Sequence, residues 1–254
     1  MKDRIATVKE NVQVADGIWS MTLAFDDFEK VEGAQFLDIK LPDKSKILRR
    51  PFCICDFDEK KKTALVCYAV VGGGTEVLSG VKAGEKLNVL LPLGNGYRPE
   101  GKRIMLIGGG MGVAVLPAVV TANPDKEFFS YIGFANAGKV VLEKELASKC
   151  AGVTVATDDG SYGKKGFVTT VAREAFDAVR PDEIFVCGPE VMYKAVRKTF
   201  EGVDVPIYVS LEQRMGCGIG ACLVCNCKVK RADGEGYVRV CKDGPVFLLN
   251  EVVL

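Results

Sequence analysis

The chain has 254 residues, of which 48% are hydrophobic and 26% charged, and its formal net charge is +1. This length suits one large domain, or two modest domains with a small appendage. The balanced charge gives no reason to expect a nucleic-acid surface or a polybasic membrane patch. The chain contains no histidine, which excludes Rieske-type clusters, His-ligated haem and any Ser-His or Cys-His nucleophile pair.

The N-terminal segment and the hydropathy pattern bear on location. The start, from Met1 to Arg4, leads into a mixed polar segment without an apolar core, so no signal peptide is expected. No apolar run approaches the roughly 20 residues that span a bilayer. We therefore expect a cytoplasmic protein that binds neither membrane nor nucleic acid.

Residues 1–98 have a β-rich pattern. Short β-branched or alternating runs at 5–8, 18–23, 64–71 and 86–91 are separated by Gly, Asp and Pro. Several short strands at such spacing indicate a small antiparallel barrel or sandwich. We predict a first domain, an antiparallel β-barrel, over 1–98.

From residue 102 the pattern changes to strand, glycine loop and helix. The apolar run 103–107 is typical of a parallel strand buried on both faces. Pro117 must kink the apolar helix predicted after the glycines, or lie near its first turn. Further strands are predicted at 128–134, 153–157 and 184–186, and helices at 113–121 and near 139–149, 168–178 and 189–200. This alternation predicts a doubly wound α/β domain over 99–208.

The remaining segment, 209–254, is too small and too rich in glycine to build a hydrophobic core of its own. Cysteines are concentrated in it, and four of them have the C-x4-C-x2-C…C spacing of plant-type [2Fe–2S] sites: Cys217, Cys222, Cys225 and Cys241. Neighbouring glycines would let the chain approach a cluster closely.

A structural zinc site is the alternative for these four cysteines. Zinc usually takes two separate C-x2–4-C pairs, whereas here one compact group is followed by one distant cysteine. The spacing therefore favours the iron–sulfur cluster. Cys227 is a fifth candidate, but it has no place in the four-ligand pattern and is left out.

Two motifs in the β-rich region could contact a pyrophosphate. Arg50-Pro51-Phe52-Cys53 precedes a predicted strand, and Gly72-Gly73-Gly74-Thr75 follows another. An arginine can pair with phosphate, and a Gly-Thr turn can offer backbone amides to it. Each motif alone is weak, because Arg-Pro and Gly-rich turns are common structural features.

Two further motifs lie in the α/β region. Gly108-Gly109-Gly110-Met111-Gly112 opens a helix after a buried strand, which suits a nucleotide phosphate, although Val113 stands where G-x-G-x-x-G needs a third glycine. Cys187-Gly188-Pro189 ends the last strand of the domain. Cys187 is either a buried cysteine before a helix start or a residue at the ligand edge of the sheet.

Taken in order, these motifs resemble the ferredoxin–NADP reductase superfamily, in which an R-P-x-S type motif and a downstream G-T precede G-G-G-x-G and C-G-P. Within it, the segment 210–215 before the cysteines and the Arg-Val-Cys-Lys-Asp-Gly-Pro setting of Cys241 resemble one family closely. This is the electron-transfer subunit of class 1B dihydroorotate dehydrogenase. The resemblance covers essentially the whole chain.

The resemblance implies three cofactors, FAD, a [2Fe–2S] cluster and NAD. Contacts to FAD are implied for Arg50, Pro51, Phe52, Cys53, Cys67, Tyr68, Ala69, Gly74 and Thr75. Contacts to NAD are implied for Gly109, Gly110 and Gly112, with Cys187 as the catalytic-site residue. The chain departs from the family at Cys53, which usually is Ser, and at Ala69, where an Arg often assists the pyrophosphate.

The resemblance also implies a partner and a direction of electron flow. An FMN-containing catalytic subunit, in an α2β2 heterotetramer, would oxidise dihydroorotate in pyrimidine biosynthesis, and electrons would pass through the cluster and FAD to NAD+. Phe134-Ala135-Asn136-Ala137 lacks an arginine for a 2′-phosphate, which favours NAD over NADP.

Two alternatives stay open. The chain could be the small subunit of a ferredoxin:NAD(P) oxidoreductase or sulfide dehydrogenase of the same architecture. It could also be a non-catalytic module that holds zinc in place of iron.

Overall fold

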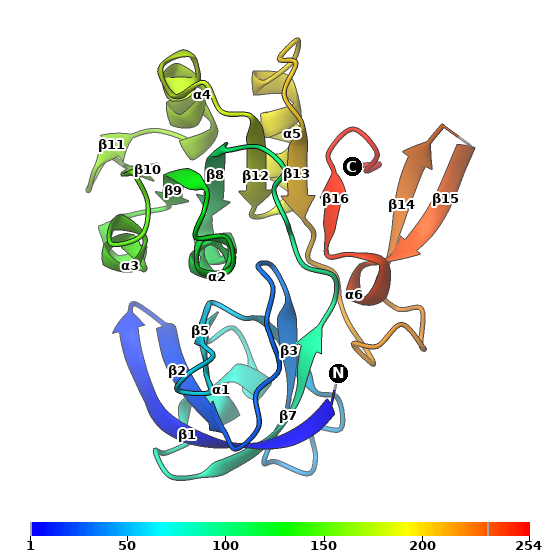
Figure 1. The fold of residues 1–254 in the computed structure, drawn as a ribbon. Helices are drawn as coiled ribbons and strands as arrows, with labels where there is room; N and C mark the ends of the chain where they lie inside the picture. The colour runs from blue at the N-terminus through cyan, green and yellow to red at the C-terminus, as the bar shows by residue number, and fades with distance from the viewer. Residues whose placement is uncertain (1, 233) are drawn as a thin grey trace.

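The computed structural model describes residues 2–232 and 234–254 and contains three sheets (Figure 1). The first has seven antiparallel strands in the order β4-β3-β7-β1-β2-β6-β5. β1 bends at register shifts between Val8 and Glu10 and between Gln13 and Ala15, as bulged strands do, and the sheet curls so that β4 approaches β6. Its elements are β1 (Lys2–Ala15), β2 (Ile18–Phe25), β3 (Phe36–Lys40), β4 (Arg50–Cys53), β5 (Asp56–Asp58), β6 (Thr63–Ala69), α1 (Gly73–Ser79) and β7 (Lys86–Leu93).

Two local expectations for this region need correction. Arg50–Cys53 does precede a strand, β5, but it is itself the strand β4, paired with residues 36–39 of β3. Gly73, Gly74 and Thr75 begin the short helix α1 rather than a turn alone. The hydroxyl of Thr75 compensates for the poor helix propensity of the glycines, because it accepts hydrogen bonds from the backbone N–H groups of Val71 (2.9 Å) and Gly72 (3.3 Å).

The second sheet has the order β11-β10-β9-β8-β12-β13-β16 and is parallel except for β16. Helices cover both of its faces, with α2 and α3 on the side of the first sheet and α4 and α5 on the other (Figure 1). The elements are β8 (Arg103–Gly109), η1 (Gly110–Val115), α2 (Leu116–Ala122), β9 (Glu127–Phe134), η2 (Ala137–Lys139), α3 (Glu143–Ala147), β10 (Gly152–Thr157), β11 (Lys164–Lys165), α4 (Val168–Val179), β12 (Glu183–Cys187), α5 (Glu190–Thr199) and β13 (Ile207–Ser210). Pro117 lies in the first turn of α2, where its missing N–H is harmless.

The C-terminal segment forms a hairpin and then returns to the second sheet. Its elements are β14 (Asn226–Arg231), β15 (Gly234–Arg239), α6 (Val240–Asp243) and β16 (Val246–Leu248). β16 pairs antiparallel with β13, at the edge of the parallel sheet. Val229, Val240 and Phe247 join one apolar cluster with Val196 and Val209 of the α/β region. The segment thus shares a core with its neighbour.

Two buried or half-buried polar contacts fix the first sheet against the second. The Thr121 hydroxyl donates to Asp56 Oδ1 of β5 (2.7 Å), and Lys149 donates to both of these side chains. Between the sheets, the buried Tyr97 hydroxyl donates to Glu183 Oε2 at 2.8 Å. Such contacts across the boundary hold the two regions in one orientation.

The described residues include no helix that is both long and apolar enough to cross a membrane.

Candidate cofactor sites

The four cysteines of the predicted cluster meet at one end of the curled sheet. Cys217, Cys222 and Cys225 lie on the loop between β13 and β14, and Cys241 lies in α6. Three backbone N–H groups, from Ile219, Ala221 and Cys222, are directed at Cys217 Sγ at 3.5, 3.3 and 3.4 Å. This loop therefore surrounds a thiolate with amide dipoles, as a group of negatively charged ligands requires.

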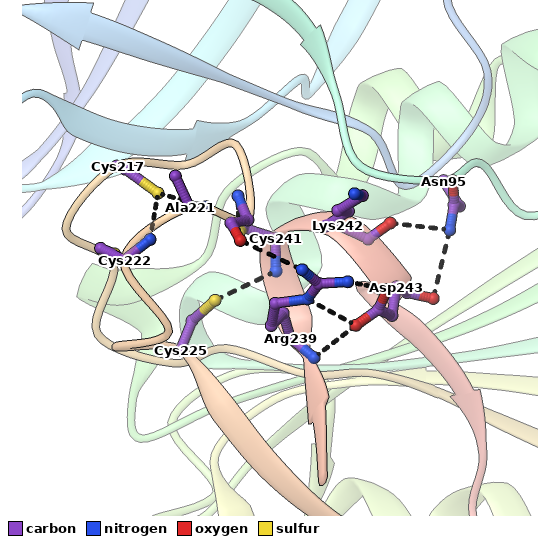
Figure 2. A network of polar contacts seen from close by, with 10 residues as sticks. Asn95, Cys217, Ala221, Cys222, Cys225, Arg239, Cys241, Lys242 and Asp243 are labelled. Carbon is purple, nitrogen blue, oxygen red and sulfur yellow. Dashed lines mark hydrogen bonds and ion pairs between the residues drawn. The ribbon is translucent and has the colours of Figure 1, made fainter.

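Backbone N–H groups are also directed at the sulfurs of Cys225 and Cys241. The N–H of Gly220 donates to Cys241 Sγ at 3.1 Å, and the N–H of Cys241 donates to Cys225 Sγ at 3.4 Å. Figure 2 shows Cys217 beside Cys222 and Cys225 beside Cys241. Among the described residues, no three Cys, Asp or Glu side chains converge as around a single ion. Two neighbouring pairs of sulfurs suit a two-iron cluster with two thiolates on each iron.

Cys217 and Cys241 differ in protonation. Burial acts to raise the pKa of Cys217, but hydrogen bonds from Ile219, Cys222 and Ala221 outweigh it and lower the pKa to about 6. Burial and the hydrogen bond with Cys225 raise the pKa of Cys241 to about 12. Cys217 is therefore largely a thiolate at neutral pH, whereas metal binding must displace a proton from Cys241.

Two glycines let the loop lie close to its surroundings. Gly218 and Gly220 have φ angles of +67° and +82°, which favour glycine. A Cβ on Gly218 would lie 2.6 Å from Asp38 Oδ2, and one on Gly220 would lie 2.6 Å from Cδ of Lys242. Both positions must stay without a side chain for the loop to keep this path.

Arg239 fastens the loop to the helix that carries Cys241. Its guanidinium donates to Asp243 through Nε and Nη2, both at 3.0 Å, and to the Gly220 carbonyl at 3.1 Å (Figure 2). Asn95, which follows β7, donates to the carbonyls of Lys242 and Asp243 at 3.1 Å. The cluster segment is thus tied both to itself and to the curled sheet.

Cys227 lies apart from the four thiols. It stands on β14 opposite Val238 and is buried among apolar residues of the shared core. Its Sγ contacts the carbonyl of Lys228 at 3.6 Å. It therefore behaves as a small core residue.

The residues expected to contact FAD come from three elements that the fold brings together. Phe52 of β4 and Tyr68 of β6 have ring centroids 5.5 Å apart. Arg50 lies over the start of α1, and a Cβ on Gly74 would be only 2.5 Å from Arg50 Nε. The remaining residues of this group lie on the same strands and turn: Pro51 and Cys53 on β4, Cys67 and Ala69 on β6, and Thr75 in α1.

These observations fit a flavin dinucleotide. The guanidinium of Arg50 and the side-chain-free backbone at Gly74 form a cradle that a Cβ would fill, and this combination suits a pyrophosphate. Ala69 supplies no charge, so Arg50 is the cation that β4 and β6 offer there. Cys67 is buried against the α/β region, and the Tyr68 hydroxyl donates to Asn11 at 2.9 Å.

A cavity of about 660 Å³ opens at the carboxyl ends of β8, β9, β10 and β12. Gly109, Gly110 and Gly112 form part of its wall, and Gly188 and Pro189 form another. A Cβ on Gly112 would lie 2.3 Å from the carbonyl oxygen of Cys187. The glycine turn and the end of β12 thus touch at the point where the strand order reverses, which is where open α/β sheets bind their ligands.

Cys187, at the end of β12, lies near Cys53 of β4 and near Glu212, which lines this cavity. Burial is the main cause that raises the pKa of Cys53, to about 12, and the carboxylate of Glu212 adds to it. Burial, followed by Glu212 and Cys53, raises the pKa of Cys187 well above its ordinary value. Both sulfurs therefore stay protonated at neutral pH and are poor nucleophiles.

Several residues at these sites were not predicted from the sequence. Glu212 lines the cavity and has a pKa raised by desolvation, yet its only signal was its place in the segment before the cysteines. Asp158 and Phe167 also line the cavity. Arg239 stands in the Arg-Val-Cys setting of Cys241, but only the fold shows what it contacts.

Comparisons with known proteins bear on the family. A family model described as the iron–sulfur cluster binding domain of dihydroorotate dehydrogenase B matches residues 212–253. The dihydroorotate dehydrogenase B (NAD(+)) electron transfer subunit of Streptococcus mutans is 40% identical over 260 residues, covering 100% of this chain and 99% of that protein. The subunit of the same name from Bacillus velezensis is 41% identical over 263 residues, covering 100% of both. The chain belongs to this family.

Solved structures of related proteins share the architecture. The NADH-dependent reduced ferredoxin-NADP oxidoreductase, studied for flavin-based electron bifurcation, is 26% identical with a TM-score of 0.87, over 98% of this chain and 89% of that one. Phthalate dioxygenase reductase is 16% identical with a TM-score of 0.64, over 97% of both chains, and shows the fold alone. The expected family and fold class are thereby confirmed.

Proposed function

We propose that the chain is the electron-transfer subunit of an NAD-dependent dihydroorotate dehydrogenase of pyrimidine biosynthesis. The observation that carries the proposal is the convergence of five backbone N–H groups on the sulfurs of Cys217, Cys225 and Cys241. Amide donors around cysteine thiolates are a means by which proteins hold and tune iron–sulfur clusters. Cys222, the fourth ligand, is exposed at the rim of the same loop.

The chain has three proposed sites, one for the cluster, one for FAD and one for NAD. When bound, the [2Fe–2S] cluster carries single electrons, and FAD collects two of them and exchanges a hydride with nicotinamide. Arg50 and the backbone at Gly74 would hold the flavin pyrophosphate, while Pro51, Phe52 and Cys53 line the flavin strand. Gly109, Gly110 and Gly112 would hold the phosphates of NAD, which leaves the nicotinamide beside Cys187.

Cys187 would act here as a neutral wall of the hydride-transfer site. Its raised pKa keeps it protonated, and neither proton abstraction nor covalent attack is needed for transfer between flavin and nicotinamide. The backbone of Cys187 lies so close to Gly112 that a side chain at Gly112 would not fit.

The charge of the cavity supports NAD rather than NADP. Of the described residues that line it, only Asp158 and Glu212 carry charge, and both are acids. A 2′-phosphate is usually met by an arginine, whereas a carboxylate accepts hydrogen bonds from the free ribose hydroxyls. We therefore infer that NADH is the preferred nucleotide.

The catalytic partner is inferred to carry FMN and to dock at the cluster face, in an α2β2 heterotetramer. Ile219, Leu223 and Val224 lie on the same loop as Cys222 and are 42%, 56% and 57% exposed, which suits the apolar centre of an interface. We further propose domain boundaries of 1–98, 99–208 and 209–254, and a cytoplasmic location.

The test uses anaerobically purified protein together with its catalytic subunit. We expect flavin absorbance, an EPR signal of a reduced [2Fe–2S] cluster, and reduction of NAD+ but much less of NADP+ when dihydroorotate is supplied. A colourless protein with bound zinc would contradict the cluster and support the non-catalytic module. Flavin and cluster signals without dihydroorotate turnover would contradict the proposed partner.

A second candidate function is favoured by one observation. The 26% identity and TM-score of 0.87 to the NADH-dependent reduced ferredoxin-NADP oxidoreductase extend over nearly the whole chain. Reduced ferredoxin would then supply the electrons in place of dihydroorotate. Turnover with reduced ferredoxin, and none with dihydroorotate, would select this alternative. A sulfide donor is tested in the same assay.

A further inference from the structure

A buried carboxylate packs against the loop between β13 and β14 that carries Cys217, Cys222 and Cys225, which we call the cluster loop. Asp38 stands on β3 of the curled sheet and is only 2% exposed. A Cβ on Gly218, the residue after Cys217, would lie 2.6 Å from its Oδ2. Among the residues that the structure describes, its Oδ1 has no hydrogen-bond partner. Asp38 and the cluster loop therefore pack against each other, with the carboxylate facing the loop.

This burial is unfavourable for the free subunit. Withdrawing a charged group from water without a direct partner is unfavourable, because no protein group replaces its hydration. Arg49 and Arg50 do not pair with the carboxylate itself. Arg49 donates to the backbone carbonyl of Asp38 (3.3 Å) and to the side chains of Asn88 and Asp3, and Arg50 donates to the carbonyl of Leu48. Burial raises the pKa of Asp38 to about 6, although Arg49 and Arg50 act to lower it. The carboxylate is thus mostly ionised at neutral pH.

The position of Asp38 relates it to both redox sites. In the sheet register it lies opposite Pro51 of the flavin strand β4 on one side and Leu90 of β7 on the other. Leu93 is also on β7, and a Cβ added to Gly218 would lie 3.5 Å from its side chain. Asp38 therefore stands at the contact between the flavin-binding sheet and the cluster loop, where electrons would cross.

If the four cysteines hold a [2Fe–2S] cluster as proposed above, we propose that Asp38 sets its reduction potential. The cluster gains one electron on reduction and loses it again on passing it to the flavin. A fixed negative charge nearby, in a site of low dielectric constant, raises the energy of the form with the extra electron. Asp38 lowers the potential of the cluster and favours transfer of the electron onward to the flavin.

The test compares midpoint potentials in the intact complex. Asp38→Asn removes the charge and keeps the shape, so the cluster potential, followed by EPR during a redox titration, should shift to a more positive value. The flavin potential, followed by absorbance, should shift less. Glu183→Gln is the matched control, because it removes another buried carboxylate (4% exposed), from β12. It should leave the cluster potential unchanged.

The possible outcomes are distinct. An unshifted potential in Asp38→Asn with full cluster content overturns the tuning role, as does an equal shift in the control. If the Asn variant fails to hold the cluster, Asp38→Ser, which is smaller and uncharged, replaces it. Loss of the cluster from both assigns Asp38 to holding the loop and overturns tuning. Absence of any [2Fe–2S] signal from the wild-type complex would instead contradict the proposed cluster site.

Discussion

In the loop around Cys217, the groups that would hold the cofactor are side chains, and the backbone amides are directed at those side chains. In the cavity above Gly109–Gly112, the backbone itself forms the wall, and the contact that shapes it is between Gly112 and the carbonyl of Cys187. The first site is built on an irregular loop. The second is built on the ends of parallel strands.

This difference predicts how each site should fail. A site made of four thiolates depends on atoms that no other residue can supply, so one substitution should abolish it. A site made by strand ends depends on the close approach of two backbone segments, so a single added methyl group should distort it while the sheet persists. Loss of one site should also leave the other site intact.

The largest effect is expected for Cys225→Ser. It removes a proposed cluster ligand, and dihydroorotate-driven reduction of NAD+ should fall at least about 100-fold, a loss of ~2.7 kcal/mol or more in transition-state terms. Oxidation of NADH by artificial acceptors, which needs only the flavin, should survive in part. Steady-state assays of both reactions and the EPR signal measure this.

Cys227→Ala is the matched control for that change, because Cys227 is a buried cysteine outside the four-ligand pattern. It should keep the cluster signal. Equal survival of both activities in Cys225→Ser would show that electrons do not pass through this site.

A smaller effect is expected for Gly112→Ala, which should impair the nucleotide site and leave the cluster intact. The new Cβ would lie 2.3 Å from the Cys187 carbonyl oxygen, and the backbone must shift, at a cost of about 1–3 kcal/mol. KM for NADH should rise about tenfold, as ~1.4 kcal/mol of binding implies, while the cluster EPR spectrum stays unchanged. Gly236→Ala, where an added Cβ meets no atom within 4 Å, is the control. A normal KM in Gly112→Ala would refute the assigned nucleotide turn.

The smallest effect is expected for Arg239→Leu. It removes the bonds that join the loop at Gly220 to Asp243, and solvent-exposed ion pairs of this kind contribute little to stability. The cluster absorbance should be lost faster on heating or with a chelator, with little change in the fully loaded activity. Arg231→Leu, which breaks the ion pair between Arg231 of β14 and Glu251 after β16, should not alter this rate. Equal rates in the two variants would contradict the role of Arg239.

The sequence predicted those features that depend on local pattern. The apolar run before Gly108–Gly112, the helix after Pro189 and the cysteine spacing are each legible within a few residues. The strand character of Arg50–Cys53 was missed because proline suggests a turn, yet β4 is an edge strand, where a proline is tolerated.

Long-range contacts could not be predicted. Nothing in the segment around Asp38 indicates that Gly218 will cover it, because the two meet only when the curled sheet and the loop are both in place. Glu212 likewise reaches the cavity and Cys187 through the path of the chain after β13. Such placements depend on tertiary structure, for which hydrophobic period and residue spacing carry no signal.

The pairing of β13 with β16 has a consequence for the whole cluster segment. Ser210, at the end of β13, lies opposite Val246, at the start of β16, so the chain leaves the parallel sheet and returns to it at neighbouring positions. Topologically, residues 211–245 are an insertion whose two ends are held together by this strand pair. Its ordering can be lost without separating strands of the sheet, but its loss would uncover Val196 and Val209, which pack against it in the shared core. Damage to this insertion should therefore also destabilise the face of the α/β region that it covers.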